Sequence, residues 1–569
     1  MTFVITQRCC NDASCVVACP VDCIRPTPGQ PDFATTEMLY IDPLTCIDCG
    51  ACVPACPVNA IYPETELPAS LERYRDINAN WFEENPLAPV PAIAPAPEPP
   101  AGRRGQLKVA IVGAGPAGCY AAEELLAHAG VEVSMIEKLP TPFGLVRAGV
   151  APDHAGTKDV TGAFEAALNR DEFRYYLNVE VDRHITRDEL LNHHHAVVYA
   201  VGASTDRPLG VPGEDLPGSH SATEFVSWYN GHPGYADRTF DLSGERVVIV
   251  GNGNVALDIA RILTADPDHL ATTDIADHAL EALRQSKVRE VVLLGRRGPA
   301  QAAYTSPEFL ALGHLSGVDV VIDVSELTLD DATAALMEAA SPSLRLKLTL
   351  AHEFAERPSD PNRKRIVFRY LVSPTAITGG EYVNAVELVH NALVEESGVM
   401  RAVPTARTES LPASLVLRSI GYQGVPVEGL PFDDQRGVVP NDGGRVTGAD
   451  DAPLRGLYVT GWVKRGATGV IGSNKADARE TVDHLLADFD AGRLEQPTRD
   501  RADLTHTLLA RQPDLVGRVG WHLIDRAETA RGNLAGRPRV KFTAVSDMVA
   551  VARAARRPTT SNQPVPEGN

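Results

Sequence analysis

The sequence predicts a multidomain chain in which a small α+β domain precedes a larger α/β region with two dinucleotide-binding units. Three observations predict this arrangement. Nine of the ten cysteines lie between Cys9 and Cys56. Residues 86–100, PLAPVPAIAPAPEPP, alternate proline with small residues and favour an extended linker over a packed core. An apolar run, a glycine-rich turn and a helical pattern follow one another at 107–138 and again at 245–263.

Composition excludes several classes of function. The 569 residues are 44% hydrophobic and 22% charged, as expected of globular domains. A formal charge of −21 argues against nucleic acid as a partner, because phosphates require a cationic surface. No apolar run approaches the roughly 18 residues of a membrane helix, and the amino terminus does not resemble a secretion signal. We therefore expect a soluble, cytoplasmic protein without membrane insertion; its oligomeric state is not indicated by the sequence.

A small cysteine-rich domain precedes the Pro/Ala-rich linker. Its expected bounds are 1–80, and those of the linker are 81–106. A domain of this size has a marginal hydrophobic core, so a bound metal would stabilise it. The last segment, 496–569, is expected to be a helical extension with a disordered tail.

The second cysteine cluster, CIDCGACVPACPV, has the spacing of iron-sulfur ligands. Its cysteines are Cys46, Cys49, Cys52 and Cys56, the last followed by proline. The first three can hold three corners of one [4Fe-4S] cluster, whereas the cysteine before proline ligates the other cluster of a two-cluster domain. A zinc site would normally use two separated C-x2-C pairs. A disulfide framework is not expected in an unexported multidomain chain.

The first cluster, CCNDASCVVACPVDC, repeats this motif incompletely. Cys15 and Cys19 form its C-x3-C-P ending, but the close triplet is missing. By the same crossing rule, Cys19 completes the [4Fe-4S] cluster of the close triplet. The second cluster then has Cys15 and Cys56, with Cys9 or Cys10 as its third ligand. It is predicted to be a [3Fe-4S] or a [4Fe-4S] cluster.

The run CPVDCI followed by MLYIDPLTCIDCGACVPACPV resembles the seven-iron ferredoxins of actinobacteria. In that family an expanded first motif leaves a [3Fe-4S] cluster, and a cysteine in the position of Cys23 is usually not a ligand. Cys9 lies closer to Cys15 than is usual there, which leaves the choice between Cys9 and Cys10 open. We expect Cys9.

The first glycine turn, GAGPAG, has the features of an FAD site. Gly113, Gly115 and Gly118 allow a tight turn, a close approach to pyrophosphate and helix packing. Glu137 ends the next predicted strand, where a carboxylate binds ribose hydroxyls. Cys119, in the following helix, has no cysteine near it in the sequence, which argues against a flavoprotein disulfide reductase.

The second glycine turn, GNGNVALD, is expected to bind NADPH. Gly251 and Gly253 are followed by Ala256 in place of a third glycine, which the fingerprint tolerates. The next strand ends in Arg296 and Arg297. Two guanidinium groups suit the 2′-phosphate of NADPH, which an acidic residue would repel.

The order of GAGPAG, KLPTPFGLVRAGVAPDH, GNGNVALDIAR, RRGP and GWVKRGATGVIGSNKADA resembles the adrenodoxin reductase-like family of NADPH-ferredoxin reductases over nearly all of 107–495. With the cysteine domain ahead of it, the chain resembles the ferredoxin-fused ferredoxin-NADP reductases of mycobacteria and their relatives. The resemblance implies that residues 1–80 form an iron-sulfur domain. It also implies an FAD domain in two segments, 107–205 and 408–495, around an inserted NADPH domain, 206–407.

The same resemblance implies particular site residues. FAD contacts are implied for Ala117, Glu137, Leu145, Val181, Trp462, Gly469, Val470 and Ile471, with Gly469 also near the nicotinamide. NADPH contacts are implied for Gly251, Asn252, Gly253, Asn254, Val255, Arg296, Arg297 and Glu308. His154 matches a histidine beside the flavin, and a lone histidine can equally be a buried structural residue. His154 and Glu308 are the candidate catalytic side chains.

We therefore expect an oxidoreductase that passes electrons from NADPH through FAD to iron-sulfur clusters, and from there to an external ferredoxin or another one-electron acceptor. The cofactors would carry the chemistry, so no protein nucleophile is required. The sequence leaves two alternatives: an electron-input subunit like the small subunit of glutamate synthase, and a non-catalytic iron-sulfur redox sensor. The first would need a catalytic partner, and the second has little use for two intact dinucleotide sites.

Overall fold

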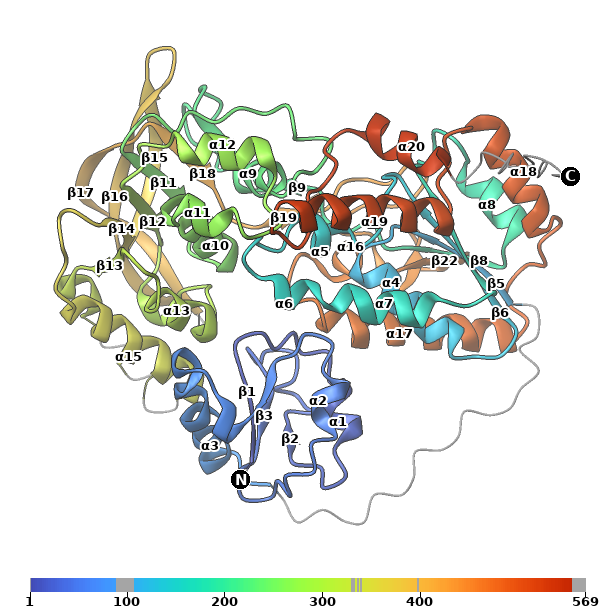
Figure 1. Ribbon diagram of the computed structural model, residues 1–569, viewed down its shortest axis with the longest axis horizontal. Coiled ribbons are helices and arrows are strands. Elements are labelled where there is room, and N and C mark those ends of the chain that lie inside the picture. Colours follow the sequence, from blue (N-terminus) through green and yellow to red (C-terminus); the bar gives the residue numbers. More distant parts are fainter. Residues whose placement is uncertain are drawn as a thin grey trace, which may run out of the picture.

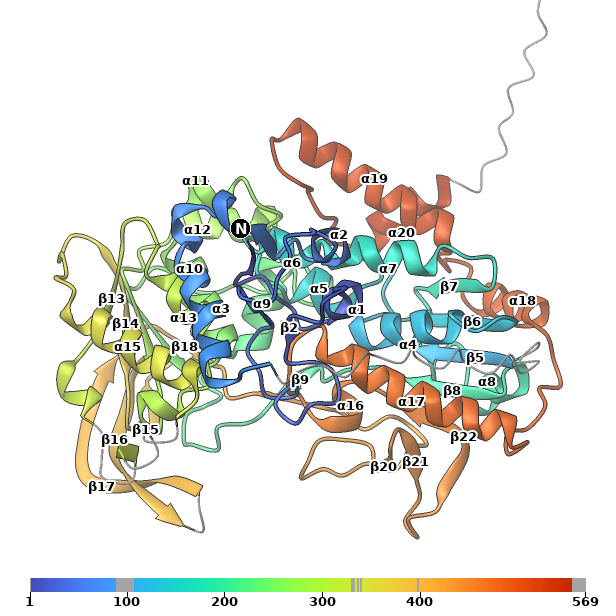
Figure 2. The same cartoon turned by 90° about the horizontal axis from the view of Figure 1, so that it is seen from below.

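The computed structural model describes residues 2–87, 107–328, 333–334, 337, 340–396 and 399–554. It contains a small amino-terminal domain and two larger lobes. The small domain, blue in Figure 1, lies beneath both lobes, and the view from below in Figure 2 shows it against the region where they meet. Most of the Pro/Ala-rich segment and the end of the carboxy-terminal tail, both predicted above, lie outside the described residues.

The small domain is built from two short antiparallel strand pairs and three helices. β1 pairs with β4, and β2 pairs with β3. Its elements are β1 (Phe3–Ile5), α1 (Ser14–Ala18), β2 (Ile24–Arg25), β3 (Tyr40–Ile41), α2 (Cys52–Ala55), β4 (Ile61–Pro63), the 3-10 turns η1 (Glu64–Glu66) and η2 (Ala69–Leu71), and α3 (Arg73–Glu84). The buried Asn78 of α3 accepts hydrogen bonds from the amides of Ile5 and Ile41, and so joins the two strand pairs.

The first lobe is centred on a seven-stranded sheet in the order β20-β21-β22-β8-β5-β6-β7. The strands from β22 to β7 are parallel, and β20 to β22 are antiparallel. The elements from the first chain segment are β5 (Leu107–Val112), α4 (Pro116–Leu126), β6 (Val131–Glu137), α5 (Gly144–Ala148), α6 (Ala155–Lys158), α7 (Val160–Leu168), β7 (Phe173–Leu177), α8 (Arg187–His193) and β8 (Ala196–Tyr199). Those from the second are β20 (Asn441–Asp442), β21 (Arg445–Thr447), β22 (Pro453–Val459), α16 (Trp462–Arg465) and α17 (Ser473–Asp490). Figure 1 shows the cyan and orange segments side by side in this lobe.

The second lobe contains a six-stranded parallel sheet, β10-β18-β11-β12-β14-β13, and a three-stranded antiparallel sheet, β15-β16-β17. The strands are β10 (Ser219–Ser221), β11 (Arg246–Val250), β12 (Glu290–Leu294), β13 (Val318–Ile322), β14 (Lys364–Arg369), β15 (Val372–Gly379), β16 (Val383–Glu396), β17 (Val399–Pro412) and β18 (Leu415–Arg418). The helices and turns are α9 (Ala222–Tyr229), α10 (Asn254–Thr264), α11 (Pro267–Leu270), α12 (Asp277–Arg284), η3 (Pro299–Gln301), α13 (Ser306–Leu312), η4 (Val324–Leu327) and α15 (Pro342–Glu356).

The two segments that cross between the lobes pair with each other. β9 (Thr205–Asp206) leads from the first lobe to the second, and β19 (Tyr422–Gln423) leads back. The two strands are antiparallel, with Tyr422 opposite Asp206. The second lobe is therefore an insertion in the first, as the family resemblance implies, and two paired strands join it to the first lobe.

Three carboxy-terminal helices complete the first lobe. They are α18 (Arg501–Arg511), α19 (Arg518–Leu534) and α20 (Val545–Arg553). Leu504 and Leu508 of α18 are fully buried in an apolar cluster with Tyr176 and Val197 of the sheet. Trp521 of α19 is buried and donates a hydrogen bond from Nε1 to Glu165 of α7 (2.9 Å). The extension predicted after residue 495 is thus part of the fold.

Two expected boundaries differ from the structure. The second lobe does not end at residue 407: β18 lies between β10 and β11 in its sheet, which carries the lobe to Arg418. The long hairpin β16-β17 separates this last strand from its neighbours in sequence, so local periodicity does not assign it to a sheet. Helix α3 likewise passes residue 80 and ends at Glu84. Among the described residues, no helix combines the length and apolarity needed to cross a membrane.

Candidate functional site

The first glycine turn lies between β5 and α4. Gly113 has φ +107°, and a Cβ there would lie 2.5 Å from the carbonyl oxygen of Ala200. A Cβ at Gly118 would lie 2.1 Å from the carbonyl oxygen of Gly113, so only glycine fits both positions. Gly115, in contrast, faces open space and caps the amino terminus of α4. The turn therefore leaves room for a phosphate against a helix amino terminus.

Glu137 lies beside this turn at the end of β6. Its carboxylate accepts hydrogen bonds from the amides of Ala114 (2.9 Å) and Leu139 (3.0 Å), which fix its orientation. Burial raises the pKa of Glu137, and these amide bonds oppose the rise. Each oxygen keeps further acceptor capacity for ribose hydroxyls.

The second chain segment of the first lobe closes on the same turn. Gly461 has φ +77°, and a Cβ there would lie 2.6 Å from the Cβ of Ala117. Trp462 follows it and donates a hydrogen bond from Nε1 to the carbonyl oxygen of Thr468 (3.1 Å), which folds the loop back. Gly469, at φ +82°, lies at the bend of that loop. The loop predicted to contact FAD thus lies near the phosphate turn.

The remaining residues expected at FAD come from three places. Val470 and Ile471 precede α17, and their carbonyl oxygens accept hydrogen bonds from the side chain of Asn474. Leu145 lies in α5, whose first residue, Gly144, approaches the Cα of Gly115 closely. Val181 is partly buried after β7, against the apolar cluster behind the sheet. Their contacts with a bound flavin remain predictions.

The second glycine turn, between β11 and α10, repeats the geometry of the first. Gly251 has φ +118°, and a Cβ there would lie 2.1 Å from the carbonyl oxygen of Ser419. Gly253 caps the amino terminus of α10. A Cβ added at Gly253 would lie 3.9 Å from the Cβ of Ala303, its nearest neighbour, so the turn has open space there. Ala256 is fully buried in the helix, where the third glycine of the fingerprint would stand.

The polar residues of this turn are held by the loop that precedes α13. Asn252 accepts a hydrogen bond from the amide of Ala303 (3.4 Å), and Asn254 accepts one from the amide of Thr305 (2.8 Å). Val255 follows Asn254 and is partly buried in the first turn of α10. The turn is therefore coupled to the start of the helix that carries Glu308.

Arg296 and Arg297 follow β12, next to this turn. Within the described part of the chain, neither guanidinium forms an ion pair. Instead, the carbonyl oxygens of the two residues accept hydrogen bonds from Asn391 (2.9 Å) and from the amide of Leu371 (3.2 Å). Burial and the neighbouring Arg296 lower the pKa of Arg297. Two uncompensated cations beside a phosphate turn suit a second phosphate, as the sequence predicts.

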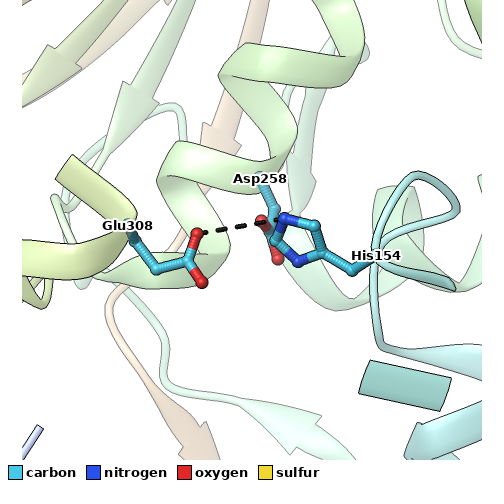
Figure 3. Close-up of side chains that lie close together, drawn as sticks. All are labelled: His154, Asp258 and Glu308. Carbon is cyan, nitrogen blue, oxygen red and sulfur yellow. Dashed lines mark ion pairs between the residues drawn. The ribbon is translucent and has the colours of Figure 1, made fainter. Parts of the chain in front are cut away.

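The two candidate catalytic side chains meet where the lobes join. His154 precedes α6 in the first lobe, and Glu308 lies in α13 of the second; Nε2 of His154 is 4.0 Å from Oε2 of Glu308. Asp258 of α10 approaches both, as Figure 3 shows. Buried Arg261 pairs with Asp258 (2.6 Å) and with Asp153. Burial raises the pKa of Glu308, while His154 opposes that rise.

The cysteines of the small domain line two separate hollows. The first hollow is lined by Cys19, Cys46, Cys49 and Cys52, with Cys23 beside them. The second is lined by Cys9, Cys10, Cys15 and Cys56. This division is the one expected from the crossing rule, and all of these cysteines are free of disulfides. Backbone amides point at the sulfur atoms of Cys9, Cys19 and Cys56 at 3.3–3.4 Å, as they do around iron-sulfur clusters.

Two family models match the chain. The model of the 4Fe-4S binding domain matches residues 39–62, and that of the pyridine nucleotide-disulphide oxidoreductases matches residues 107–293. A probable ferredoxin/ferredoxin-NADP reductase of Mycobacterium bovis is 50% identical over 569 residues, covering 98% of this chain and 96% of the relative. This chain belongs to the ferredoxin-fused ferredoxin-NADP reductases.

Shorter reductases match the two lobes. NADPH-ferredoxin reductase FprA of Mycobacterium tuberculosis is 48% identical over 455 residues, which cover 78% of this chain and 98% of FprA. A solved structure of FprA in complex with NADPH matches 78% of this chain and 99% of FprA, with 47% identity and a TM-score of 0.74. About a fifth of the fused reductase therefore lies outside the match with FprA, close to the share of the small domain and its linker.

The fold separates the fused reductase from disulfide chemistry. Cys119 is fully buried in α4, and its Sγ lies 3.6 Å from the carbonyl oxygen of Ala114. Every other cysteine lies in the small domain. Cys119 therefore has no cysteine partner in the two lobes with which to form a redox-active disulfide.

The geometry around Cys9 and Cys10 favours the first as ligand. Both cysteines line the hollow that also contains Cys15 and Cys56, and the amide of Leu39 points at Sγ of Cys9 (3.4 Å). Cys10 is buried among apolar residues of the first lobe, with Ile471 and Tyr120, and its carbonyl oxygen accepts a hydrogen bond from the amide of Gly472 (2.8 Å). Ligation by Cys9 remains a prediction.

Sequence reasoning missed several residues of the site. Asp258 and Arg261 lie in the motif GNGNVALDIAR, and Asp153 lies in APDH, so the motifs themselves could have marked them. Gln7 of the small domain donates a hydrogen bond to Glu308 (3.1 Å), and Glu37 accepts one from the amide of Ser306 (2.9 Å). No sequence signal marks these last two, because their contacts depend on how folded domains dock.

Proposed function

We propose that the fused reductase oxidises NADPH and delivers the electrons one at a time to iron-sulfur clusters and an external ferredoxin. The balanced reaction converts two oxidised ferredoxins and one NADPH into two reduced ferredoxins, NADP+ and one proton. The observation that carries the proposal is the hydrogen bond from the amide of Gly472 to the carbonyl oxygen of Cys10. It joins the loop expected at FAD to the cysteine hollow, so electron donor and acceptor sites are neighbours.

The residues present fit the cofactors that the family implies. When bound, NADPH supplies a hydride, FAD exchanges an electron pair for single electrons, and the clusters carry single electrons. Gly113, Gly115 and Gly118 would bind the FAD pyrophosphate, with Glu137 on the ribose. The turn at Gly251 and Gly253, with Arg296 and Arg297, would hold NADPH.

His154 and Glu308 would then line the nicotinamide site, each from a different lobe. Their pairing brings residues of both lobes to within 4.0 Å of each other, so it orients the second lobe on the first. The buried pair of Arg261 with Asp258 holds the carboxylates beside His154 in place. These side chains orient the bound groups and exclude water; no covalent step on the protein is required.

The two cysteine sets differ in their position relative to the first lobe and to solvent. Cys9, Cys15 and Cys56 line the hollow that faces the first lobe and would hold a [3Fe-4S] cluster, or a [4Fe-4S] cluster with a fourth ligand. Cys19, Cys46, Cys49 and Cys52 would hold a [4Fe-4S] cluster. Cys49 is exposed to solvent, which supports an external acceptor at that edge.

Anaerobic stopped-flow spectroscopy tests the proposal on the purified fused reductase. Addition of NADPH should bleach the flavin first and the clusters afterwards, and added oxidised ferredoxin should then be reduced. EPR of the oxidised protein gives the cluster types, because an oxidised [3Fe-4S] cluster is paramagnetic and an oxidised [4Fe-4S] ferredoxin cluster is not. Bleaching of the flavin without reduction of either the clusters or ferredoxin would contradict the proposal.

A further inference from the structure

We propose that Gln7 of the small domain is a positioning residue for Glu308, so that the docked small domain helps to set the reductase's hydride-transfer site. The inference rests on the proposed function, because Glu308 matters only if NADPH reacts there. FprA aligns over 98% of its length to 78% of this chain, and the share outside the match is close to that of the small domain and its linker. Because FprA is named a reductase without that added part, we expect loss of the Gln7 contact to slow hydride transfer moderately and not to abolish it.

The direct contact links three parts of the fold. Nε2 of Gln7 donates a hydrogen bond to Oε2 of Glu308 (3.1 Å), the same oxygen that lies 4.0 Å from Nε2 of His154. Gln7 comes from the small domain, His154 from the first lobe and Glu308 from the second. An amide that donates to a carboxylate fixes its rotamer and stabilises its charged form.

A second contact holds the helix that carries Glu308. Oε2 of Glu37 accepts hydrogen bonds from the amide of Ser306 (2.9 Å), the first residue of α13, and from the hydroxyl of Ser343 (2.5 Å). A carboxylate is favoured at a helix amino terminus, where backbone amides lack partners. Lys347 lies 3.8 Å from Glu37 and compensates part of its charge. The small domain thus holds both the side chain of Glu308 and the start of its helix.

The small domain, which carries Gln7, contacts both lobes through ion pairs. Arg73 forms a two-pronged ion pair with Glu353 of α15 in the second lobe, with both distances 2.9 Å. On the first lobe, Lys475 of α17 donates to Ser14 (3.0 Å) and pairs with Asp12 (3.3 Å). Because the small domain is attached at both ends, its loop cannot move away from Glu308 without breaking one of these contacts.

A double-mutant cycle tests whether Gln7 acts through Glu308. The fused reductase and its Gln7→Leu, Glu308→Leu and double variants are mixed with saturating NADPH, and the rate of flavin bleaching and the NADPH dissociation constant are both measured. Gln7→Leu keeps the side-chain size and removes the donor. We expect it to slow bleaching about 3- to 10-fold in the original chain, which corresponds to the net contribution of one ordinary intramolecular hydrogen bond. NADPH affinity should stay within about twofold.

The same substitution in the Glu308→Leu background should change the rate by less than about 1.5-fold, because the acceptor oxygen is already gone. Gln7→Glu gives a second variant of equal size; it faces one carboxylate with another and should slow bleaching more than Gln7→Leu. Gln30→Leu, at an exposed turn of the same domain, is the matched control. Iron content and the flavin spectrum show whether each variant has folded.

The outcomes separate the two proposals. If NADPH does not bleach the flavin of the unmodified chain, the proposed function fails. If bleaching is normal but Gln7→Leu and Gln7→Glu leave its rate unchanged, the positioning role of Gln7 is refuted. Equal slowing by Gln7→Leu in both backgrounds would also refute it, because a general disturbance of docking would act independently of Glu308.

Discussion

The amide of Gly472 donates a hydrogen bond to the carbonyl oxygen of Cys10 over 2.8 Å, and a Cβ at Gly472 would lie only 2.2 Å from that oxygen. The absence of a side chain at Gly472 is thus what allows the small domain to touch the first lobe here. Ile471, next to it, packs in the same apolar cluster as Cys10. Gly472 itself has φ −70° and ψ −23°, which any residue can adopt, so the constraint on it is space and not backbone strain.

Gly472→Ala should therefore slow electron transfer from the flavin to the clusters much more than it slows reduction of the flavin by NADPH. The added methyl group pushes the small domain from the first lobe, and electron transfer between the flavin and the clusters should slow at least tenfold. Flavin bleaching by NADPH should slow no more than in Gln7→Leu. Stopped-flow traces of the flavin and the clusters give both rates. Gly162→Ala on α7, where a Cβ meets nothing within 4 Å, is the control; cluster reduction as fast in Gly472→Ala as in this control would contradict the prediction.

The parts of the site that could be predicted from the sequence are those that one stretch of chain determines. The phosphate turns and the two cysteine motifs are recognised from local spacing, and the crossing rule then assigns cysteines of both motifs to each cluster. The structure has the glycines at the predicted close approaches. Arg296 and Arg297 were predicted from their offset behind a glycine turn, and they lie beside it without ion-pair partners in the described chain.

The parts that could not be predicted depend on surfaces that meet only after folding. Gln7 is an ordinary polar residue between a strand and Cys9, and nothing near it in sequence indicates a partner 301 residues away. Strand β18 was placed in the wrong lobe because its partners, β10 and β11, lie far from it along the chain. Such contacts are long-range, and residue type at one end says little about the other.

Replacing both Arg296 and Arg297 with alanine should weaken NADPH binding selectively. Losing two charge-assisted contacts to the 2′-phosphate should raise the NADPH dissociation constant about 30- to 100-fold, equivalent to about 2 to 3 kcal/mol. NADH has no 2′-phosphate, so its constant should change by less than about threefold. Titration of the flavin spectrum measures both. Arg284→Ala, an exposed arginine of α12 in the same lobe, is the control, and an equal loss for the two nucleotides would refute the assignment.

Substitution of Cys9 and Cys10 one at a time should decide between them. Cys9→Ser should lose the iron of one cluster, roughly three or four atoms per chain, together with its EPR signal. Cys10→Ser should keep its iron, because Cys10 is buried on the side that packs against the first lobe. Cys119→Ser, buried in α4, controls for the loss of any thiol. Full iron content in Cys9→Ser with loss in Cys10→Ser would move the ligand to Cys10.

His194 should make the first lobe sensitive to acid. It is buried between α8 and β8, with Nδ1 on the carbonyl oxygen of Leu190 (2.9 Å), and burial lowers its pKa to about 3 from an ordinary 6.5. The folded state therefore keeps His194 neutral while the unfolded state takes up a proton below pH 6.5. The stability that depends on the neutral ring is complete above pH 6.5 and is lost as the pH falls towards 3.

Between pH 7 and pH 5 this group alone should cost about 2 kcal/mol of unfolding free energy. His194→Gln removes the titration, so the variant should lose about 2 kcal/mol less than the unmodified chain over that interval, although its stability at pH 7 should be lower. Urea unfolding followed by flavin fluorescence at both pH values measures the difference. The remaining slope is expected from other buried groups, among them His232, whose pKa burial lowers to about 4. His352→Gln, at an exposed site on α15, should leave the pH dependence as it is; the same slope in His194→Gln and in His352→Gln would show that His194 is not the titrating group.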